Sequence, residues 1–250
     1  RCTGRLHSNR RGVRSVRIDG VVVSCEHGGN RVPAEWSHLF RGAARVLDSH
    51  RGWDPGALGL ARRIARRMSA PLHASTVTRL LVEPNRSERH RSLFSRYTRS
   101  LSLDARERIL RRHYYPHRRK VEGDLTAALR GGGRVMHLSV HTFTPVLDGD
   151  VRRVDVGLLY DPARPAERSL CDAWARDLKR ASPGLRVRKN HPYRGAADGF
   201  TTYLRRTLGR RYLGIELEVS QRFFGKDGRP LAADVLTRVV ETAARAAGRA

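Results

Sequence analysis

The chain contains little cysteine and few aromatic residues. Its three cysteines, Cys2, Cys25 and Cys171, include no CxxC pair and cannot all pair with one another. This pattern excludes a disulfide-based scaffold and is typical of a reducing, cytoplasmic environment. Aromatic residues make up 6% of the 250 residues. The aromatic-rich signatures of RNA-binding modules are absent.

Long apolar runs are also missing. No segment approaches the roughly 20 apolar residues that a membrane-spanning helix needs. The basic start, residues 1–17, lacks the apolar centre of a signal peptide. We therefore expect no membrane segment. We expect residues 1–15 to form a disordered basic tail and, because nothing resembles a linker, residues 16–250 to form one domain with a sizeable core.

Acidic residues are few relative to basic ones. Lys and Arg number 50 against 24 Asp and Glu, which gives a formal net charge of +26. Such a charge is common in proteins that bind anionic polymers. Only four of the 50 basic residues are lysine, however, as a GC-rich coding sequence would produce. Many arginines also fall on the polar faces of predicted helices, so nucleic acid is a possible partner but not the favoured one.

Apolar runs rich in β-branched residues alternate with segments of helical period. We expect strands at residues 16–25, 73–82, 135–140, 154–160, 185–189 and 212–219, and helices at residues 55–68, 103–129, 166–180 and 232–247. Pro116 should kink or split the second helix. This order predicts an α/β fold, a single-domain three-layer sandwich whose central sheet is mostly parallel or mixed, with helices on both faces.

The first chemical signal is an apolar run that ends in a polar turn. Residues 21–33 read VVVSCEHGGNRVP, so a predicted strand leads directly to His27 and two glycines. Strand ends of this kind display reactive groups in α/β enzymes. A neutral imidazole can bind a metal, and glycines let backbone or substrate come close. His27 is therefore a candidate functional residue if other strand ends supply partners.

Two further segments could supply those partners. Asp54 lies in the polar loop DSHRGWDPG before a predicted helix, where its carboxylate could cap the helix, bind a metal or do both. His141 lies at the end of a predicted strand in HLSVHTFTP, a suitable place for a metal ligand or general base. A lone histidine there would more often be a hydrogen-bonded core residue, but together with His27 it indicates function.

Two carboxylates and an Asn-Arg pair complete the set. Glu216 and Glu218 share one face of the predicted strand in GIELEVSQ, where an isolated ionised carboxylate is costly to bury. Glu218, nearer the strand end, is the better candidate for a general base acting on metal-bound water. Glu216 is the better candidate for a salt bridge, although the two roles could be reversed. Asn85 and Arg86 suit bidentate capture of a carboxylate, whereas Arg86 alone could equally be a solvated residue.

With these residues in view, the chain resembles the N-formylglutamate amidohydrolase family from about Val21 to Phe224. The segments that carry the resemblance are, in order, SCEHGGNRVP, DSHRGWDPGA, RLLVEPNRS, HTFTP, PYRGAADGFTTYLR and GIELEVSQ. That family is similar in architecture to zinc carboxypeptidases, aspartoacylase and succinylglutamate desuccinylase. The resemblance implies a zinc carboxypeptidase-like fold over residues 16–250. It also implies a metal-dependent hydrolase that cleaves the amide bond of a small-molecule N-acyl amino acid such as N-formylglutamate.

The resemblance further implies roles for individual residues. In those relatives a histidine and an acid three residues later bind zinc, together with a histidine from a later strand. An Asn-Arg pair holds the substrate carboxylate, and a glutamate activates water. Carried over by motif, this implies Zn²⁺ binding by His27 and His141, carboxylate binding by Asn85 and Arg86, and a general base at Glu218.

This chain departs from the pattern at one metal ligand. The residue three positions after His27 is Asn30, and an amide is a poor zinc ligand compared with a carboxylate. Asp54 is then the expected third ligand, with Asn30 or Glu26 as alternatives. The further residues expected to hold the substrate or shape its pocket are Arg79, Tyr193 and Asp198.

Two other functions are kept as hypotheses. In the first, Cys25 is the nucleophile of a cysteine-dependent amidase and His27 is its base, since the two share a strand face. In the second, the chain is a basic nucleic-acid-binding protein on an enzyme-like fold, with binding that depends steeply on salt.

Overall fold

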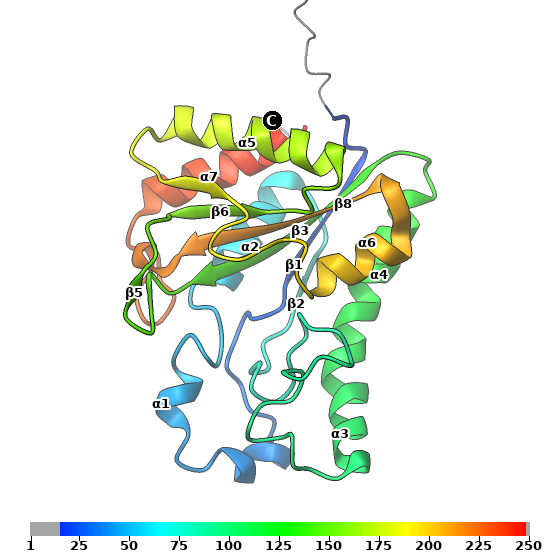
Figure 1. Cartoon of the computed structure of the whole chain (residues 1–250), viewed down its shortest axis with the longest axis vertical. Helices are drawn as coiled ribbons and strands as arrows, with labels where there is room; N and C mark the ends of the chain where they lie inside the picture. Colours follow the sequence, from blue (N-terminus) through cyan, green and yellow to red (C-terminus); the bar gives the residue numbers. More distant parts are fainter. Residues whose placement is uncertain (1–15, 249–250) are drawn as a thin grey trace, which may run out of the picture.

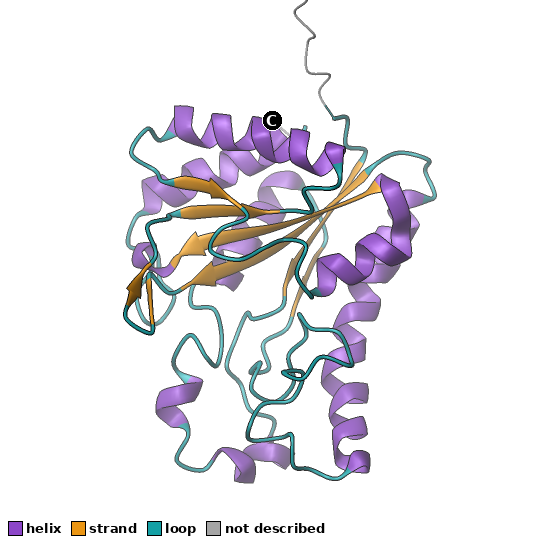
Figure 2. Ribbon diagram, viewed as in Figure 1, coloured by secondary structure: helices purple, strands orange, loops and turns teal. Residues whose placement is uncertain are grey.

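The computed structural model describes residues 16–248 and consists of a central sheet between two layers of helices (Figures 1 and 2). The tail expected at residues 1–15 lies outside the described residues. The sheet has six strands in the order β2-β1-β3-β8-β6-β7. Their bounds are β1 Gly20–Cys25, β2 Leu72–Ala74, β3 Val135–Phe143, β6 Val156–Leu159, β7 Val187–Lys189 and β8 Tyr212–Ser220.

The sheet is mixed. Strands β2, β1, β3 and β8 run parallel to one another, whereas β6 is antiparallel to β8 and parallel to β7. Because parallel strands end at the same edge, the residues that follow β1 and those at the ends of β3 and β8 meet there. The predicted α/β sandwich with a mostly parallel or mixed sheet is confirmed.

Side-chain alternation explains the two helical layers. Met136, Leu138 and Val140 of β3 pack on the face covered by α2 (Ala57–Met68), α5 (Pro165–Ala181) and α7 (Ala233–Ala246). The opposite face is covered by α4 (Tyr115–Leu129) and α6 (Phe200–Leu208), which pack around Val135 and Tyr212 (Figure 1). All nine residues of β3 are buried. The polar residues of this strand, His137, Ser139, His141 and Thr142, are therefore buried and need hydrogen-bond partners within the protein.

A second cluster of apolar side chains lies beyond the carboxyl edge of the sheet, in the lower half of Figure 1. It contains Trp36 and Phe40 of a 3₁₀ helix, η1 (Ala34–Phe40), and Ile109 of α3 (Leu103–Ile109). The short helix α1 (Ala44–Leu47) lies beside it. Leu81 and Leu93 belong to the same cluster, so it anchors the long irregular segment between β2 and α3 that carries Asn85 and Arg86.

One predicted strand and one predicted helix differ in detail from the observed elements. The strand expected at residues 73–82 is only β2, because residues 75–78 hydrogen-bond to the turn after β1 instead of to a strand. That turn needs its glycine, since a Cβ at Gly29 would lie 2.7 Å from the carbonyl oxygen of Thr76. The helix expected at residues 103–129 is divided near Pro116, as predicted: a π-helical turn, η2 (Leu110–Tyr114), lies between α3 and α4, because the ring and missing N–H of Pro116 disrupt regular helical bonding.

Several short elements were not predicted. The helix α6 was missed, and so were the hairpin of β4 (Val146–Leu147) and β5 (Asp150–Val151) and the 3₁₀ turns η3 (Gly209–Arg211) and η4 (Gln221–Phe223). Segments of this length offer too few residues for a periodic signal. Within residues 16–248, no helix combines the length and apolar character needed to cross a bilayer.

Candidate metal centre and substrate cavity

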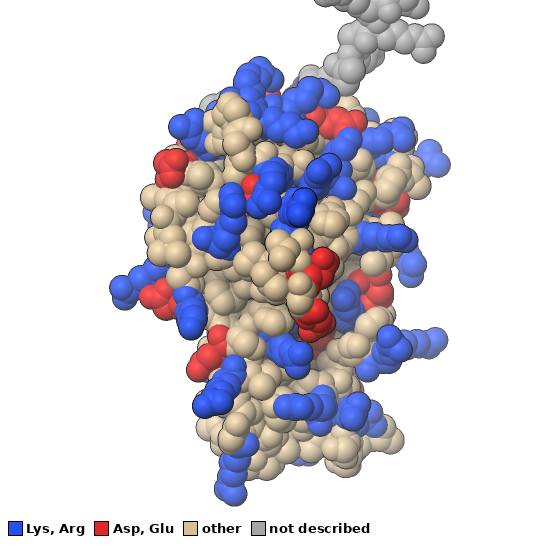
Figure 3. Space-filling view, turned by 60° about the vertical axis from the view of Figure 1, so that its left-hand side comes forward, with Lys and Arg blue, Asp and Glu red and all other residues tan. Residues whose placement is uncertain are grey.

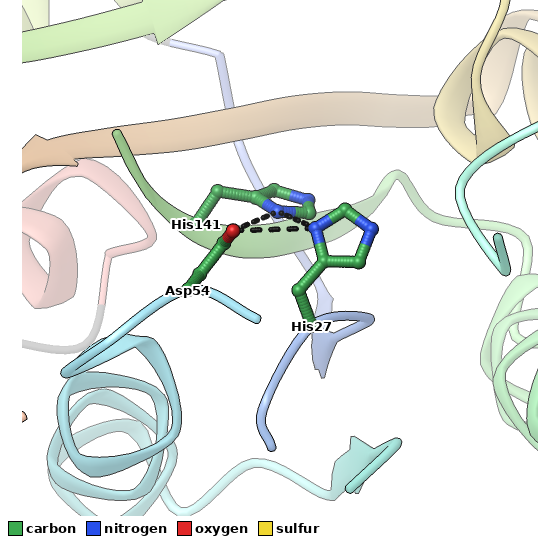
Figure 4. A group of neighbouring side chains, drawn as sticks. All are labelled: His27, Asp54 and His141. Carbon is green, nitrogen blue, oxygen red and sulfur yellow. Dashed lines mark hydrogen bonds and ion pairs between the residues drawn. The ribbon is translucent and has the colours of Figure 1, made fainter. Parts of the chain in front are cut away.

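Three buried side chains converge beside the carboxyl ends of β1 and β3 (Figure 4). His27 comes from the turn after β1, Asp54 from the loop before α2 and His141 from β3. The distances are 3.1 Å between the two Nδ1 atoms, 3.2 Å from Asp54 Oδ2 to His27 Nδ1 and 3.0 Å from Asp54 Oδ2 to His141 Nδ1. None of the three residues is more than 4% exposed. The structure thus brings together the three residues predicted to bind a metal.

The Asp54 carboxylate contacts both histidines and does not cap helix α2. The N-cap residue of α2 is Gly56, whose φ of 86° is the left-handed conformation that glycine tolerates, and α2 has no side-chain cap. The Asp54 backbone N–H donates to His27 O at 2.9 Å, which ties the loop to the turn after β1. Its carboxylate also accepts a 3.4 Å hydrogen bond from Arg79 Nη1. The expectation that Asp54 could cap α2 is therefore wrong.

Each of the two histidine rings contacts a second carboxylate through its Nε2 atom. Glu83 Oε1 lies 2.5 Å from His27 Nε2, and Glu26 Oε2 lies 3.1 Å from His141 Nε2. Burial opposes ionisation of both acids. Nevertheless the Arg79 and His27 charges hold the pKa of Glu83 low, and hydrogen bonds from His117 and His141 hold the pKa of Glu26 well below its usual range. In metal sites, outer carboxylates of this kind orient the histidine rings and fix their tautomers.

The donor set fits a divalent cation. Each Nε2 faces a carboxylate. With a hydrogen on each Nε2, the two rings would present Nδ1 lone pairs beside the Asp54 carboxylate. Two lone pairs and a carboxylate repel one another unless positive charge lies among them. Burial lowers the pKa of His141, but hydrogen bonds to Asp54 and Glu26 outweigh it and leave that pKa well above its usual value. In tetrahedral zinc sites with bonds of about 2.0–2.1 Å, ligand atoms lie about 3.3 Å apart, close to the sides of this triangle.

The alternative third ligands lie elsewhere. Asn30 Nδ2 donates to Leu47 O at 3.2 Å and to Asp48 Oδ1 at 2.8 Å, so this amide fastens a neighbouring loop. Glu26 lies on the far side of the His141 ring and also accepts a 2.6 Å hydrogen bond from Ser139 Oγ. Neither side chain contacts the Nδ1 atoms of His27 and His141, which Asp54 does contact.

The two glutamates of β8 differ in their partners. Glu218 is paired with His141 in the register of β3 and β8 and is 5% exposed. Its Oε2 has no hydrogen-bond partner among the described residues, and burial, helped by the Asp54 and Glu216 charges, raises its pKa to about 8. Glu216 Oε1, by contrast, accepts a 2.5 Å hydrogen bond from Thr201 Oγ1. Of the two, Glu218 has the free oxygen that a general base requires.

A cavity of about 390 Å³ opens above the triangle. Asn85 and Arg86 line it, as does Glu218. Asn85 Oδ1 accepts a 2.8 Å hydrogen bond from the Phe200 backbone N–H, which leaves the amide NH₂ group as the end available to a ligand. Arg86 Nη1 donates to the carbonyl oxygen of Asp198. The Asn-Arg pair is thus held against the start of α6 at the cavity wall.

The remaining predicted pocket residues also line this cavity. The Arg79 guanidinium group contacts two carboxylates: its Nε donates to Glu83 Oε2 at 2.7 Å, and its Nη1 contacts Asp54. Tyr193 accepts a 2.9 Å hydrogen bond from Arg152 Nη1 through its hydroxyl group. Asp198 Oδ2 accepts a 3.1 Å hydrogen bond from the Ser87 backbone N–H. The structure places Arg79 as a support for two site carboxylates, while Tyr193 and Asp198 hold the cavity walls.

Comparison with known proteins identifies the family of this chain. The family model for N-formylglutamate amidohydrolase matches residues 19–224. The chain belongs to this family. Gene product Atu2144 from Agrobacterium tumefaciens has a similar structure, with 26% identity and a TM-score of 0.75 over 93% of this chain and 92% of that protein.

A member of this amidohydrolase family with a solved structure shares the fold. The N-formylglutamate amidohydrolase from Ralstonia eutropha is 19% identical, with a TM-score of 0.66 over 94% of this chain and 95% of that one. A comparison with curated proteins finds no significant match. The predicted family resemblance is confirmed.

Sequence reasoning missed two residues of the site of this amidohydrolase. Glu83, in the same VEPNRS segment as Asn85 and Arg86, was not considered as a partner of His27. An acid four residues after Arg79 was the available signal, since the two side chains form an ion pair. Arg194 was not singled out among the many arginines, although it lines the cavity. Arg194 forms no ion pair within residues 16–248.

The hypothesis that Cys25 is a catalytic nucleophile does not fit this structure. Cys25 is fully buried in the hydrophobic core between the sheet and α2, and it does not line the cavity. Burial raises the pKa of its thiol well above the usual value, whereas a nucleophilic cysteine needs a lowered one.

On the face shown in Figure 3, the basic side chains are spread out. Figure 3 shows Lys and Arg side chains over the whole visible face instead of in one band, with acidic side chains grouped near its middle. The hypothesis of a nucleic-acid partner stays a prediction.

Proposed function

We propose that this chain is a zinc-dependent amidohydrolase that removes the formyl group from an N-formyl amino acid with an acidic side chain, such as N-formylglutamate. The observation that carries the proposal is the buried triangle of His27, Asp54 and His141 at the base of a cavity lined by Arg86 and Arg194. Family membership supports amide hydrolysis.

The triangle is the part of the site suited to Zn²⁺. When bound by these three residues, Zn²⁺ would supply a Lewis acid that activates water and polarises the substrate carbonyl group. Glu26 and Glu83 keep the two histidine rings oriented for binding. The Arg79 charge is the main influence that keeps the pKa of Glu83 low. The pKa of Asp54 is kept low by the His27 charge and by hydrogen bonds from both histidines, with a smaller contribution from Arg79.

Glu218 performs the proton transfers. Its free Oε2 accepts a proton from the attacking water and then delivers it to the nitrogen of the leaving amine as the C–N bond breaks. The products are formate and the free amino acid. A cation held by the triangle would favour the ionised form of the buried Glu218 carboxyl, which is the form that acts as the base.

Two cationic side chains suit a dicarboxylate substrate. Asn85 and Arg86 hold the α-carboxylate with an amide and a planar guanidinium, a pairing that also orients the amide bond towards the triangle. Arg194, on the same cavity, holds the side-chain carboxylate of the substrate. The formal net charge of +26 assists the capture of such an anion.

The cellular location belongs to the same proposal. We place the reaction in the cytoplasm because the chain has few cysteines, of which Cys25 and Cys171 are buried free thiols.

Metal analysis together with a substrate panel tests this function. The purified protein should contain about one zinc per chain, lose activity on chelation and recover it when zinc is restored. N-formylglutamate should be cleaved faster than N-acetylglutamate and N-succinylglutamate. His27→Ala should abolish both zinc binding and activity, while the exposed His38→Ala serves as the matched control. Full activity in metal-free protein would refute the zinc mechanism.

A further inference from the structure

Arg118 of α4 is a buried arginine that forms no ion pair with a carboxylate of the described residues. It is 7% exposed, and burial lowers its pKa. Three aromatic rings surround its guanidinium carbon, at centroid distances of 4.1 Å for Phe200, 4.7 Å for Tyr203 and 4.9 Å for Tyr114. A buried charge without a counter-ion is costly unless cation–π contacts and hydrogen bonds compensate it.

The hydrogen bonds of Arg118 go to the substrate-binding segment. Its Nη1 donates to Pro84 O at 3.1 Å and to Arg86 O at 3.4 Å. The hydroxyl group of Tyr114 donates to the same Arg86 oxygen at 2.7 Å. Residues 83–87 belong to no helix or strand, so their carbonyl groups depend on donors from other elements.

The aromatic contacts reach the same segment from the other side. Phe200, whose ring lies nearest to Arg118, donates its backbone N–H to Asn85 Oδ1. The Asp198 carbonyl group, two residues before Phe200, accepts from Arg86 Nη1. Arg118 therefore links α4, the start of α6 and both carbonyl groups that flank Asn85.

We propose that Arg118 is the positioning residue that orients Asn85 and Arg86 for the substrate carboxylate, an inference that rests on the proposed function. Arginine suits this task because its planar guanidinium can stack between rings while donating in its own plane. Lysine keeps the charge but loses the planar stacking group and the fork of donors.

The proposal predicts a selective loss of substrate binding. Arg118→Lys should raise KM for N-formylglutamate at least tenfold and leave kcat within twofold, because Glu218 and the metal triangle are untouched. Zinc content should not change. Tyr114→Phe, which removes one donor to Arg86 O and keeps the cation, should raise KM by a smaller factor. Arg119→Lys, an exposed neighbour that stacks on Tyr115, is the matched control and should behave as wild type. Wild-type KM in Arg118→Lys, or a loss confined to kcat, would overturn the proposal.

A measurement without substrate separates this inference from the proposed function. Hydrogen exchange at the backbone amides of Asn85, Arg86 and Ser87 should speed up at least tenfold in Arg118→Lys and stay unchanged in Arg119→Lys. If the wild type cleaves no N-formyl amino acid, the proposed function fails. Unchanged exchange in Arg118→Lys contradicts the positioning role whatever the substrate is.

Discussion

The carboxylate of Glu26 lies 3.1 Å from Nε2 of His141, on the opposite side of the imidazole ring from Asp54. His141 is therefore held between two acids, with one nitrogen for each. In a metal site, an outer acid of this kind would fix the hydrogen on the nitrogen facing it and leave the inner nitrogen to bind a cation. His27 repeats this arrangement with Glu83 and Asp54.

Glu26→Gln should weaken zinc binding by about 10- to 100-fold, the usual effect of losing an outer carboxylate. A glutamine can hydrogen-bond to His141 but supplies no negative charge, so both the basicity of the ring and its tautomer preference decline. Competition with a chromogenic chelator measures the affinity. Glu107→Gln, at an exposed position on α3, should leave it unchanged. An unaltered affinity in Glu26→Gln would contradict the role assigned to Glu26.

Glu218→Gln should lower kcat by about 10²- to 10⁴-fold in the zinc-loaded protein, the range expected for loss of a general acid–base group. Zinc content should be retained, because Glu218 is not one of the three ligands. Steady-state kinetics on matched, metal-analysed samples would check this. A variant with wild-type kcat would exclude Glu218 as the base.

The same variant should change how stability depends on pH in the metal-free protein. The pKa of Glu218 is raised from 4.5 to about 8, so the folded state holds a proton that the unfolded state releases between these values. The contribution of Glu218 to stability therefore falls as pH rises from about 4.5 to about 8. Urea unfolding in the presence of a chelator should show Glu218→Gln gaining stability relative to wild type across this window. Parallel pH profiles would show that the carboxyl is not neutral in the fold.

Arg194→Ala should affect substrates according to their charge. KM for N-formylglutamate should rise by roughly 10- to 100-fold, since a charge-assisted hydrogen bond is lost, whereas KM for the neutral analogue N-formylglutamine should change little. Arg188→Ala, an exposed arginine on β7 that does not line the cavity, is the control. Equal effects on both substrates would indicate that Arg194 does not contact the side-chain carboxylate.

Glu167→Ala should destabilise the fold by about 3–5 kcal/mol, the usual result of leaving a buried charge without its partner. Glu167 is fully buried and lies 3.1 Å from Arg205 Nε, and Arg205 also donates to Gly195 O and Gly214 O. Chemical denaturation measures the loss. Glu241→Ala breaks a half-exposed ion pair on α7 and should cost at most about 1 kcal/mol. Equal losses in the two variants would contradict the burial argument.

Much of the site could be predicted from local sequence. His27 and His141 follow or end β-branched apolar runs, so their places at a sheet edge are predictable from the strand pattern and from the parallel order of the strands. Asn85 and Arg86 follow the strand expected at residues 73–82, but they lie in an irregular segment whose carbonyl groups accept hydrogen bonds from Arg118. Their proximity to the cavity comes from hydrogen bonds between elements, which no local pattern encodes.

The sequence by itself determined the α/β class, the family and the residue types of the site, because hydrophobic period and short motifs are local properties. Tertiary structure alone places Asp54, and not Asn30 or Glu26, against the Nδ1 atoms of both histidines. All three are polar residues next to predicted strands or helices, and only the turn made by Gly56 and the packing of β1 against β3 show which carboxylate faces both histidine Nδ1 atoms. That placement depends on distances between segments far apart in sequence, and these distances exist only once the chain has folded.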